Sequence, residues 1–224
     1  MLDWNRIDTV LLDMDGTLLD LRFDAVFWLE HMPRHFARHH GLADADARQR
    51  LERLFRQSRR QLEFYCLDWW REQTGLDIVG LKQELQHLIR YRPTAREFLD
   101  QVRASGRQAI IVTNAHRDSL ALKHRVTGIV DHVDRVISAH DYRIPKEDPA
   151  FWDRVRADLG MQPARAVLVD DNLDALAAAG QSGVGELFAV TQPDSGAPPL
   201  ADLPYRALAD FVSLGTPAAN RQDP

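Results

Sequence analysis

The sequence predicts an α/β fold, a Rossmann-like three-layer arrangement around a parallel sheet, with an all-helical segment inserted near its start. An apolar run at Val10–Leu12 is typical of a buried strand. After Pro93, apolar runs alternate with helical patterns, as they do in βαβ units. Residues 21–91 instead show helical periodicity and no clear strand. These three observations indicate one parallel sheet and one helical insert.

Composition limits both the size and the function of the protein. Its 224 residues suffice for one domain with an insert and a sizeable core. A net charge of −5 argues against binding to nucleic acid or another polyanion. The only cysteine is Cys66, so no internal disulfide can form and a reducing compartment fits. No signal peptide or bilayer-spanning apolar run is recognisable. We therefore expect a cytoplasmic protein without a membrane partner, either a monomer or a small homo-oligomer.

The insert contains three predicted helices. They cover Ala25–His40, which ends at Gly41, then Asp44–Thr74, which ends near Gly75, and finally Leu81–Ile89. The second helix carries an apolar stripe at three- or four-residue spacing, formed by Leu51, Leu54, Phe55, Leu62, Tyr65, Cys66 and Trp69. This stripe predicts a helix with one buried face.

The alternating pattern of strands and helices begins at Pro93. Thr94 and Glu97 form a predicted capping box, whose helix should end at Gly106. Asp148-Pro149 begins another helix, which Gly160 ends. Further predicted helices are 117–127 and 173–181, and the predicted strands are 109–113, 135–138, 166–170 and 186–190. We expect a core domain of residues 1–20 and 91–200, an insert of 21–90, and a C-terminal tail of 201–224 whose last ten residues are disordered.

Two carboxylates follow the first strand directly, in the run Asp13-Met14-Asp15-Gly16-Thr17. Gly16 lets the backbone turn sharply, and open α/β sheets bind their ligands at this edge. One carboxylate here could attack an electrophile, while the second could move protons. On these five residues alone, an ordinary surface turn is the alternative.

Polar residues also follow other predicted strands: Thr113 and Asn114 after one, and Asp170 and Asp171 after another. Lys146 follows the strand 135–138 through a loop. Because parallel strands end at a common edge, these side chains could converge with the first motif. Carboxylates there would hold Mg²⁺, which prefers oxygen ligands, and the lysine and hydroxyl would offset the charge of a phosphoryl group. The alternative for any single member is a strand end that meets a loop.

The four motifs, in this order and spacing, resemble those of the haloacid dehalogenase (HAD) superfamily. The match covers the predicted core, and the helical insert resembles the C1-type cap of that superfamily. The resemblance implies a magnesium-dependent phosphatase that works through an aspartyl-phosphate. Asp13 would be its nucleophile, and Asp15 would be general acid and then general base. Dehalogenases of the superfamily lack the second acid, so Asp15 favours phosphoester over carbon–halogen chemistry.

By the same resemblance, the remaining motif residues would bind phosphate and metal. Thr113 and Asn114 would bind phosphoryl oxygens, and Lys146 would balance negative charge. His116 either contacts the phosphate or leaving group, or is an ordinary loop histidine. In the last motif, Asp171 would be the usual metal ligand, and Asp170 would be a second ligand or would hold water. The magnesium ligands would be Asp13, the Asp15 backbone carbonyl, Asp171 and Asp170.

The insert and several loops resemble those of bacterial purine 5′-nucleotidases that act on GMP and IMP. This likeness lies at residues 65–70, 75–78, 113–116, 145–148 and 193–196. It implies a purine nucleoside monophosphate as substrate. Trp28, Tyr65 or Trp69 could stack on the base, and the alternative for each is the core of the insert. Asp68 could accept a purine N–H or be a solvated helix residue.

Other functions and other patterns remain as alternatives. A sugar-phosphate or phosphoglycolate-type phosphatase, or a phosphomutase, would share the motifs, because the insert decides the substrate. A catalytically silent phosphate-binding scaffold is disfavoured by four intact motifs. His31, His35 and His39 recur every four residues, but no zinc partners lie near them in sequence, which favours a solvated face. The arginine run 48–60 is interrupted by acids. It is interpreted as a solvent-exposed helix face, from which one arginine could reach the substrate.

Overall fold

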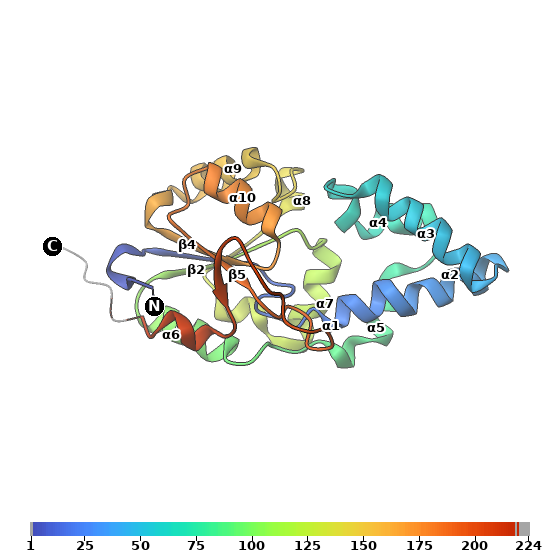
Figure 1. Cartoon of the computed structure of the whole chain (residues 1–224), viewed down its shortest axis with the longest axis horizontal. Helices are drawn as coiled ribbons and strands as arrows, with labels where there is room; N and C mark the ends of the chain where they lie inside the picture. Colours follow the sequence, from blue (N-terminus) through green and yellow to red (C-terminus); the bar gives the residue numbers. More distant parts are fainter. Residues whose placement is uncertain (1, 218, 220–224) are drawn as a thin grey trace.

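The computed structural model describes residues 2–217 and 219 of the chain. Its centre is a six-stranded, all-parallel sheet in the order β3-β2-β1-β4-β5-β6. Helices cover both faces of this sheet, and a helical insert extends from one end of it (Figure 1). The predicted α/β, Rossmann-like fold is therefore confirmed.

The strands and the helices around the sheet follow the predicted alternation. The strands are β1 (Thr9–Leu12), β2 (Gln108–Thr113), β3 (Arg135–Ser138), β4 (Ala166–Asp170), β5 (Glu186–Val190) and β6 (Arg206–Leu208). The flanking helices are α6 (Ala95–Ala104), α7 (Arg117–Thr127), α8 (Ala139–Tyr142), α9 (Pro149–Leu159) and α10 (Leu173–Gln181). Short 3₁₀ segments are η1 (Trp4–Arg6), η5 (Ile129–His132), η6 (Pro163–Arg165) and η7 (Phe211–Leu214).

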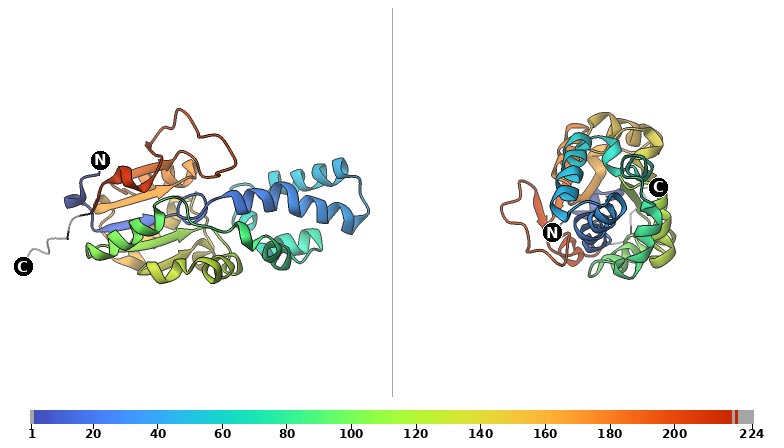
Figure 2. Two further views of the ribbon diagram at one scale, coloured as in Figure 1. Left: turned by 90° about the horizontal axis from the view of Figure 1, so that it is seen from below. Right: turned by 90° about the vertical axis from the view of Figure 1, so that its right-hand side faces the viewer.

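The insert is helical throughout and has its own apolar cluster, which includes the fully buried Phe27 and Trp70. Figure 2 shows its helices projecting beyond the sheet. Its segments are α1 (Arg22–Val26), the π-helical η2 (Phe27–His31), α2 (Met32–His40), α3 (Asp44–Ser58), η3 (Leu62–Tyr65), α4 (Leu67–Thr74), α5 (Ile78–Glu84) and η4 (Gln86–Leu88). Within residues 2–217 and 219, no helix has the length and apolar content needed to cross a bilayer.

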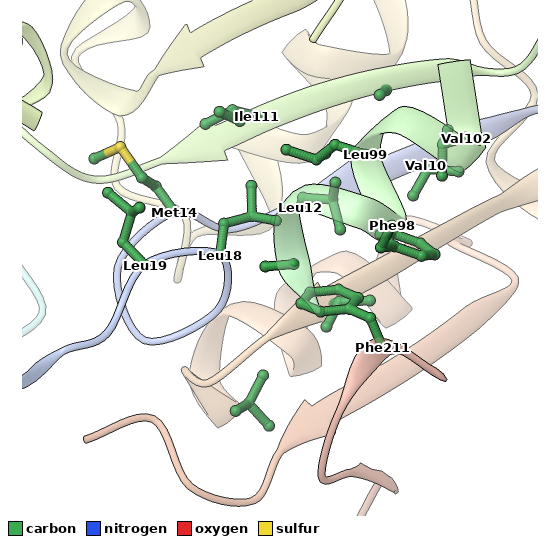
Figure 3. Packing of buried hydrophobic residues seen from close by; sticks show 14 of the residues in the cluster. Val10, Leu12, Met14, Leu18, Leu19, Phe98, Leu99, Val102, Ile111 and Phe211 are labelled. Atoms are coloured by element: carbon green, nitrogen blue, oxygen red, sulfur yellow. The ribbon is translucent and has the colours of Figure 1, made fainter. Parts of the chain in front are cut away.

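The central strand β1 is buried on both faces, and its side chains alternate between two apolar clusters. Val10 and Leu12 pack with α6 residues on one face (Figure 3). Leu11 points to the other face, where α9 and α10 supply the partners. This two-residue alternation is what an extended strand imposes. The middle of the sheet is therefore held from both sides, which fixes the end of β1 where the first motif begins.

The predicted continuous helix Asp44–Thr74 is wrong. The helix α3 ends at Ser58, and α4 begins only at Leu67, after a 3₁₀ turn. Leu51 is buried in the apolar cluster of the insert, whereas Leu62 packs against the cluster of α9 and α10. One straight helix could not face both clusters, so tertiary packing overrides the helical pattern.

Thr94 does not cap α6 in the predicted way. Its φ of 62° is left-handed, and its hydroxyl makes no capping hydrogen bond. A capping side chain reaches the first helical N–H groups from extended backbone, which this conformation is not. The helix still forms from Ala95, because Phe98 and Leu99 bury its apolar face against the sheet.

The C-terminal segment adds to the sheet, although no strand was predicted after residue 190. The edge strand β6 pairs in parallel with β5, and Leu208 is buried. Behind it, Phe211 stacks on Phe98 with ring centroids 4.6 Å apart. A three-residue strand is too short to show alternation in the sequence, so its pairing decides its conformation. The predicted disorder of the last ten residues concerns mostly positions outside the described part of the chain.

Candidate active site

The carboxyl ends of three neighbouring strands bring the predicted motifs together. Asp13 follows β1, Thr113 ends β2 and Asp170 ends β4. All three side chains are buried. The Asp13 N–H donates to the Val169 carbonyl over 3.0 Å, which extends the pairing of β1 and β4 by one residue. The strand that carries Asp13 thus lies between the other two.

Gly16 gives the chain its turn after β1. Its φ of 90° lies in the left-handed region, which favours glycine. A Cβ atom at this position would lie 2.6 Å from Oδ2 of Asp171, well inside contact distance. Gly16 therefore permits the turn and also leaves room for Asp171 to approach the first motif.

Lys146 joins the two acidic motifs, although it lies far from both in sequence. Its Nζ is 2.6 Å from Oδ1 of Asp13 and 2.6 Å from Oδ2 of Asp170. The same ammonium donates to the Val112 carbonyl over 3.0 Å. Its backbone N–H donates to Oδ1 of Asn114 over 2.9 Å, so the second motif orients the third. The predicted lysine is therefore placed in the middle of the charged cluster.

Negative charge exceeds positive charge in this cluster. One oxygen of each of Asp13, Asp170 and Asp171 lies within 4.8 Å of the others, with Lys146 as the ammonium that bridges two of them. Burial raises the pKa of Asp13 to about 7, against the opposing effect of Lys146. Burial and the two neighbouring carboxylates also raise the pKa of Asp171. Three carboxylates with excess charge fit a hard divalent cation such as Mg²⁺, which would offset that charge.

Asp15 is held by a chain of ions that was not predicted, in which both ammonium groups are buried. Its Oδ1 lies 2.6 Å from Nζ of Lys123 on α7, and that ammonium lies 2.7 Å from Oδ2 of Asp24 on α1. Oδ1 of Asp24 in turn lies 2.7 Å from Nζ of Lys82 on α5. This chain of four charges runs from the first motif into the insert.

The ion chain also sets proton affinities. Burial raises the pKa of Asp15 to about 6, and Lys123 opposes that rise. Burial would raise the pKa of Asp24 too, but Lys123 and Lys82 outweigh it and hold the pKa below its usual range. The ammonium of Lys82 is 2% exposed and lies 4.5 Å from the ring centre of Phe27, so an aromatic wall replaces water there. Asp24 is thus an anion at neutral pH.

Glu147 gathers a second network that was not predicted. Its carboxylate accepts hydrogen bonds from Asn114 Nδ2 over 3.0 Å and from Asn172 Nδ2 over 2.8 Å. The hydroxyl of Tyr65 in the insert donates to the same carboxylate over 2.6 Å. Burial and the negative charge of Glu147 raise the pKa of Tyr65, which keeps its proton in place. The insert and the sheet domain are therefore linked directly beside the motif residues.

A cavity of about 360 Å³ lies over this edge of the sheet, a size typical of small-molecule sites. Every predicted site residue lines it, namely Asp13, Asp15, Thr113, Asn114, His116, Lys146, Asp170 and Asp171. The insert contributes Trp28, Phe64 and Tyr65 to its wall. Trp69 instead packs against Trp70 in the apolar cluster of the insert, with ring centroids 4.9 Å apart. The cavity thus combines a charged floor with an aromatic wall.

The two patterns interpreted as solvated faces contribute nothing to the cavity. His31 is hydrogen-bonded to Glu84 over 2.9 Å, and neither residue lines the cavity. All six arginines of the basic run are exposed, and none of them lines it. Asp68 also lies outside the cavity wall, although its Oδ2 is 3.6 Å from Nε2 of His116. The exposure of the arginines agrees with a solvated face, whereas His31 and His35 are half-buried beside Glu84, so the solvated-face interpretation is wrong for these two histidines.

The family described as haloacid dehalogenase-like hydrolase matches residues 7–183. The chain belongs to this family. A relative from Escherichia coli (strain K12), the GMP/IMP nucleotidase YrfG, is 40% identical over 214 residues, which are 94% of this chain and 95% of the relative.

Solved structures share the fold at lower identity. A HAD phosphatase from Thermococcus onnurineus has a TM-score of 0.74 and 23% identity, covering 90% of this chain and 93% of that one. The L-2-haloacid dehalogenase from Xanthobacter autotrophicus has a TM-score of 0.52 and 22% identity, covering 83% and 78%. Because a phosphatase and a dehalogenase both match, the fold alone does not choose the reaction.

Proposed function

We propose that this protein is a magnesium-dependent phosphomonoesterase that hydrolyses purine 5′-nucleotides such as GMP and IMP. The observation that carries this proposal is the position of Asp13, with its carboxylate bound to Lys146 beside Asp170 and Asp171. A second carboxylic acid, Asp15, lines the same cavity two residues further along the chain. Nucleophile, charge balance and proton carrier are then all within one small site.

The reaction would proceed in two displacements at phosphorus. Asp13 attacks the phosphoryl group and forms an aspartyl-phosphate, while Asp15 gives a proton to the departing 5′-oxygen of the nucleoside. Asp15 then takes a proton from the water that attacks the aspartyl-phosphate, which releases phosphate and restores Asp13. Thr113, Asn114 and Lys146 hold the phosphoryl oxygens. Mg²⁺, held by the carboxylates of Asp13, Asp170 and Asp171 and the Asp15 carbonyl, would neutralise charge on the phosphoryl group and orient it.

Three observations support a phosphate ester of a purine nucleoside. Asp15 is needed where the leaving oxygen requires a proton, whereas a departing halide requires none. The aromatic wall of Trp28, Phe64 and Tyr65 offers faces on which a purine could stack. The relative with 40% identity is named for GMP and IMP. We further propose that residues 21–90 act as a cap domain over a core of 1–20 and 91–200, and that the cap excludes bulk water during turnover.

A panel of phosphate esters tests this proposal. Phosphate release from GMP, IMP, AMP, glucose 6-phosphate and phosphoglycolate would be measured with Mg²⁺ and with a chelator. We expect the highest kcat/KM for GMP and IMP, and no turnover after chelation or in Asp13→Asn. Faster hydrolysis of a sugar phosphate would remove the nucleotide claim. No turnover of any ester would favour the phosphate-binding scaffold.

A further inference from the structure

A second group of metal-binding atoms lies at the junction between the insert and the sheet domain. One ligand atom from each of Cys66, His116 and His140 lies within 4.8 Å of the other two. Cys66 precedes α4 in the insert, His116 caps α7 and His140 belongs to α8. The group therefore combines a thiol from the insert with two imidazoles from the sheet domain.

His140 has the arrangement of a metal ligand. Its Nε2 is buried and has no hydrogen-bond partner among the described residues. The backbone of Asn114 lies beside the ring and opposes the lowering of the His140 pKa. Ligating histidines usually donate one ring N–H to a backbone carbonyl or carboxylate and bind the metal through the other nitrogen. Burial, together with the nearby His116, lowers the pKa of His140, which keeps its ring neutral.

The other two side chains are also available to a metal. Cys66 is a free, half-buried thiol. The ring of His116 lies 5.1 Å from that of His140, measured between centroids. Nδ1 of His116 accepts the backbone N–H of Asp118 over 3.3 Å, which leaves the proton of the neutral ring on Nε2. Transfer of that proton to Nδ1, which lies 3.6 Å from the Asp118 carboxylate, would free Nε2 for a metal. Nε2 of His116, which faces Oδ2 of Asp68 at 3.6 Å, can then bind a metal.

The donor chemistry selects the metal. A thiolate and two imidazoles suit a borderline-soft ion such as Zn²⁺, whereas the three carboxylates around Asp13 suit Mg²⁺. In a tetrahedral zinc site, the ligand atoms are about 3.3 to 3.6 Å apart. The atoms of Cys66, His116 and His140 would have to approach one another by at most about 1.5 Å. Rotation of the side chains and a small movement of the insert can supply this, and Asp68 or water would take the fourth position.

We propose that Cys66, His116 and His140 form a zinc site that ties the insert to the sheet domain. His116 lines the cavity described above, so the ion sits at its edge. An ion bound on both sides of the junction holds the insert against the sheet domain and hinders exchange of ligands with the cavity.

Cobalt is the probe for this site, because a thiolate bound to Co²⁺ absorbs in the near ultraviolet. The full-length protein, freed of metals by chelation and then saturated with Mg²⁺, is titrated with Co²⁺ and afterwards with Zn²⁺. We expect one equivalent of cobalt to give the thiolate band and zinc to abolish it. Cys66→Ser should lose the band. His140→Gln should weaken cobalt binding by at least about 10- to 100-fold, because that loss is typical when only a hydrogen-bond partner of a metal ligand is removed.

A matched control separates this site from the other histidine pair. His31→Gln removes an imidazole from the group of His31, His35 and Glu84, and it should leave the cobalt band unchanged. Circular dichroism verifies that each variant is folded. A wild-type protein that binds neither Co²⁺ nor Zn²⁺ at micromolar concentration would overturn the proposal, as would a band lost in His31→Gln but kept in His140→Gln.

The effect on the cavity is measured separately, and this arm rests on the proposed phosphatase activity. With Mg²⁺ saturating, added Zn²⁺ should slow turnover of the wild-type protein at least tenfold more than that of Cys66→Ser. Equal inhibition of both proteins would mean that zinc acts at the carboxylates around Asp13, and the tie between insert and sheet domain would be refuted. The cobalt titration needs no turnover, so it remains decisive if the protein hydrolyses none of the esters.

Discussion

Replacing Asp24 by asparagine is the sharpest test of the ion chain behind Asp15. Asp24 is the carboxylate that pairs with the buried ammonium of Lys82, at 2.7 Å, and it also binds Lys123. In Asp24→Asn, Lys123 keeps Asp15, but Lys82 loses its carboxylate partner while remaining inside the protein. Removing one partner of a buried ion pair costs about 3–5 kcal/mol, because the remaining charge is uncompensated. We expect a loss of that size in the free energy of unfolding.

Urea unfolding, followed by fluorescence and extrapolated linearly, measures this loss. With a slope of about 3 kcal/mol/M, the midpoint should fall by about 1 to 2 M. Adding Lys82→Met to Asp24→Asn should recover part of the loss, because the uncompensated ammonium is then gone. Glu52→Gln is the matched control, since its exposed pair with Arg56 contributes at most about 0.5 kcal/mol.

Two results would refute this reasoning. A loss below about 1 kcal/mol in Asp24→Asn would mean that water reaches Lys82 and that the pair behaves like a surface pair. A further loss in the double variant, instead of a recovery, would mean that Lys82 stabilises the insert by its packing against aromatic rings rather than through Asp24.

Three further predictions concern the first motif and the contact between insert and sheet domain. Asp15→Asn should slow GMP turnover by about 10²–10⁴-fold, measured as kcat, and a smaller effect would assign the proton to another group. Burial raises the pKa of Asp13 to about 7, above its unfolded value, so the folded state binds an extra proton between about pH 4 and 7. The free energy of unfolding of the metal-free protein should therefore fall as pH rises through that range. The fall should be smaller in Asp13→Asn and in the presence of Mg²⁺. Equal urea midpoints at about pH 5 and pH 8 would contradict this prediction. Tyr65→Phe removes the hydrogen bond to Glu147, worth about 1.5–3 kcal/mol, and should raise KM by about 10- to 150-fold; an unchanged KM would mean that the insert closes without that bond.

The site at the edge of the sheet was predictable because short stretches of the sequence indicate each of its parts. Each of these strands is recognisable in the sequence as a short apolar run, and a polar residue ends the run or follows it directly. Asp13, Thr113 and Asp170 all follow or end such runs. Parallel strands must end on a common side, so the meeting of these side chains follows from the order of strands and helices alone. The role of Lys146 was predicted from the resemblance of the four motifs to those of a known family, and no periodicity in the sequence indicates it.

The ion chain and the Glu147 network were not predictable, because a helical pattern does not distinguish a buried charge from a solvated one. Lys82 and Lys123 occur in helices whose other charged residues are mostly exposed. Each is buried only because a carboxylate from another segment meets it: Asp24 for the former, and Asp15 with Asp24 for the latter. Burial of a charge is stable only when such a partner is present. That condition is a property of the assembled structure.

By itself, the sequence determined the parallel sheet, the helical insert and the set of oxygen and ammonium groups at one edge, since these depend on periodicity and chain direction. Tertiary structure alone decided where the insert breaks its helices, which charges are buried, and how Tyr65 meets Glu147. The physical reason is distance along the chain. Contacts between segments separated by tens of residues choose among local conformations of similar energy, and that choice leaves no regular pattern in the residues themselves.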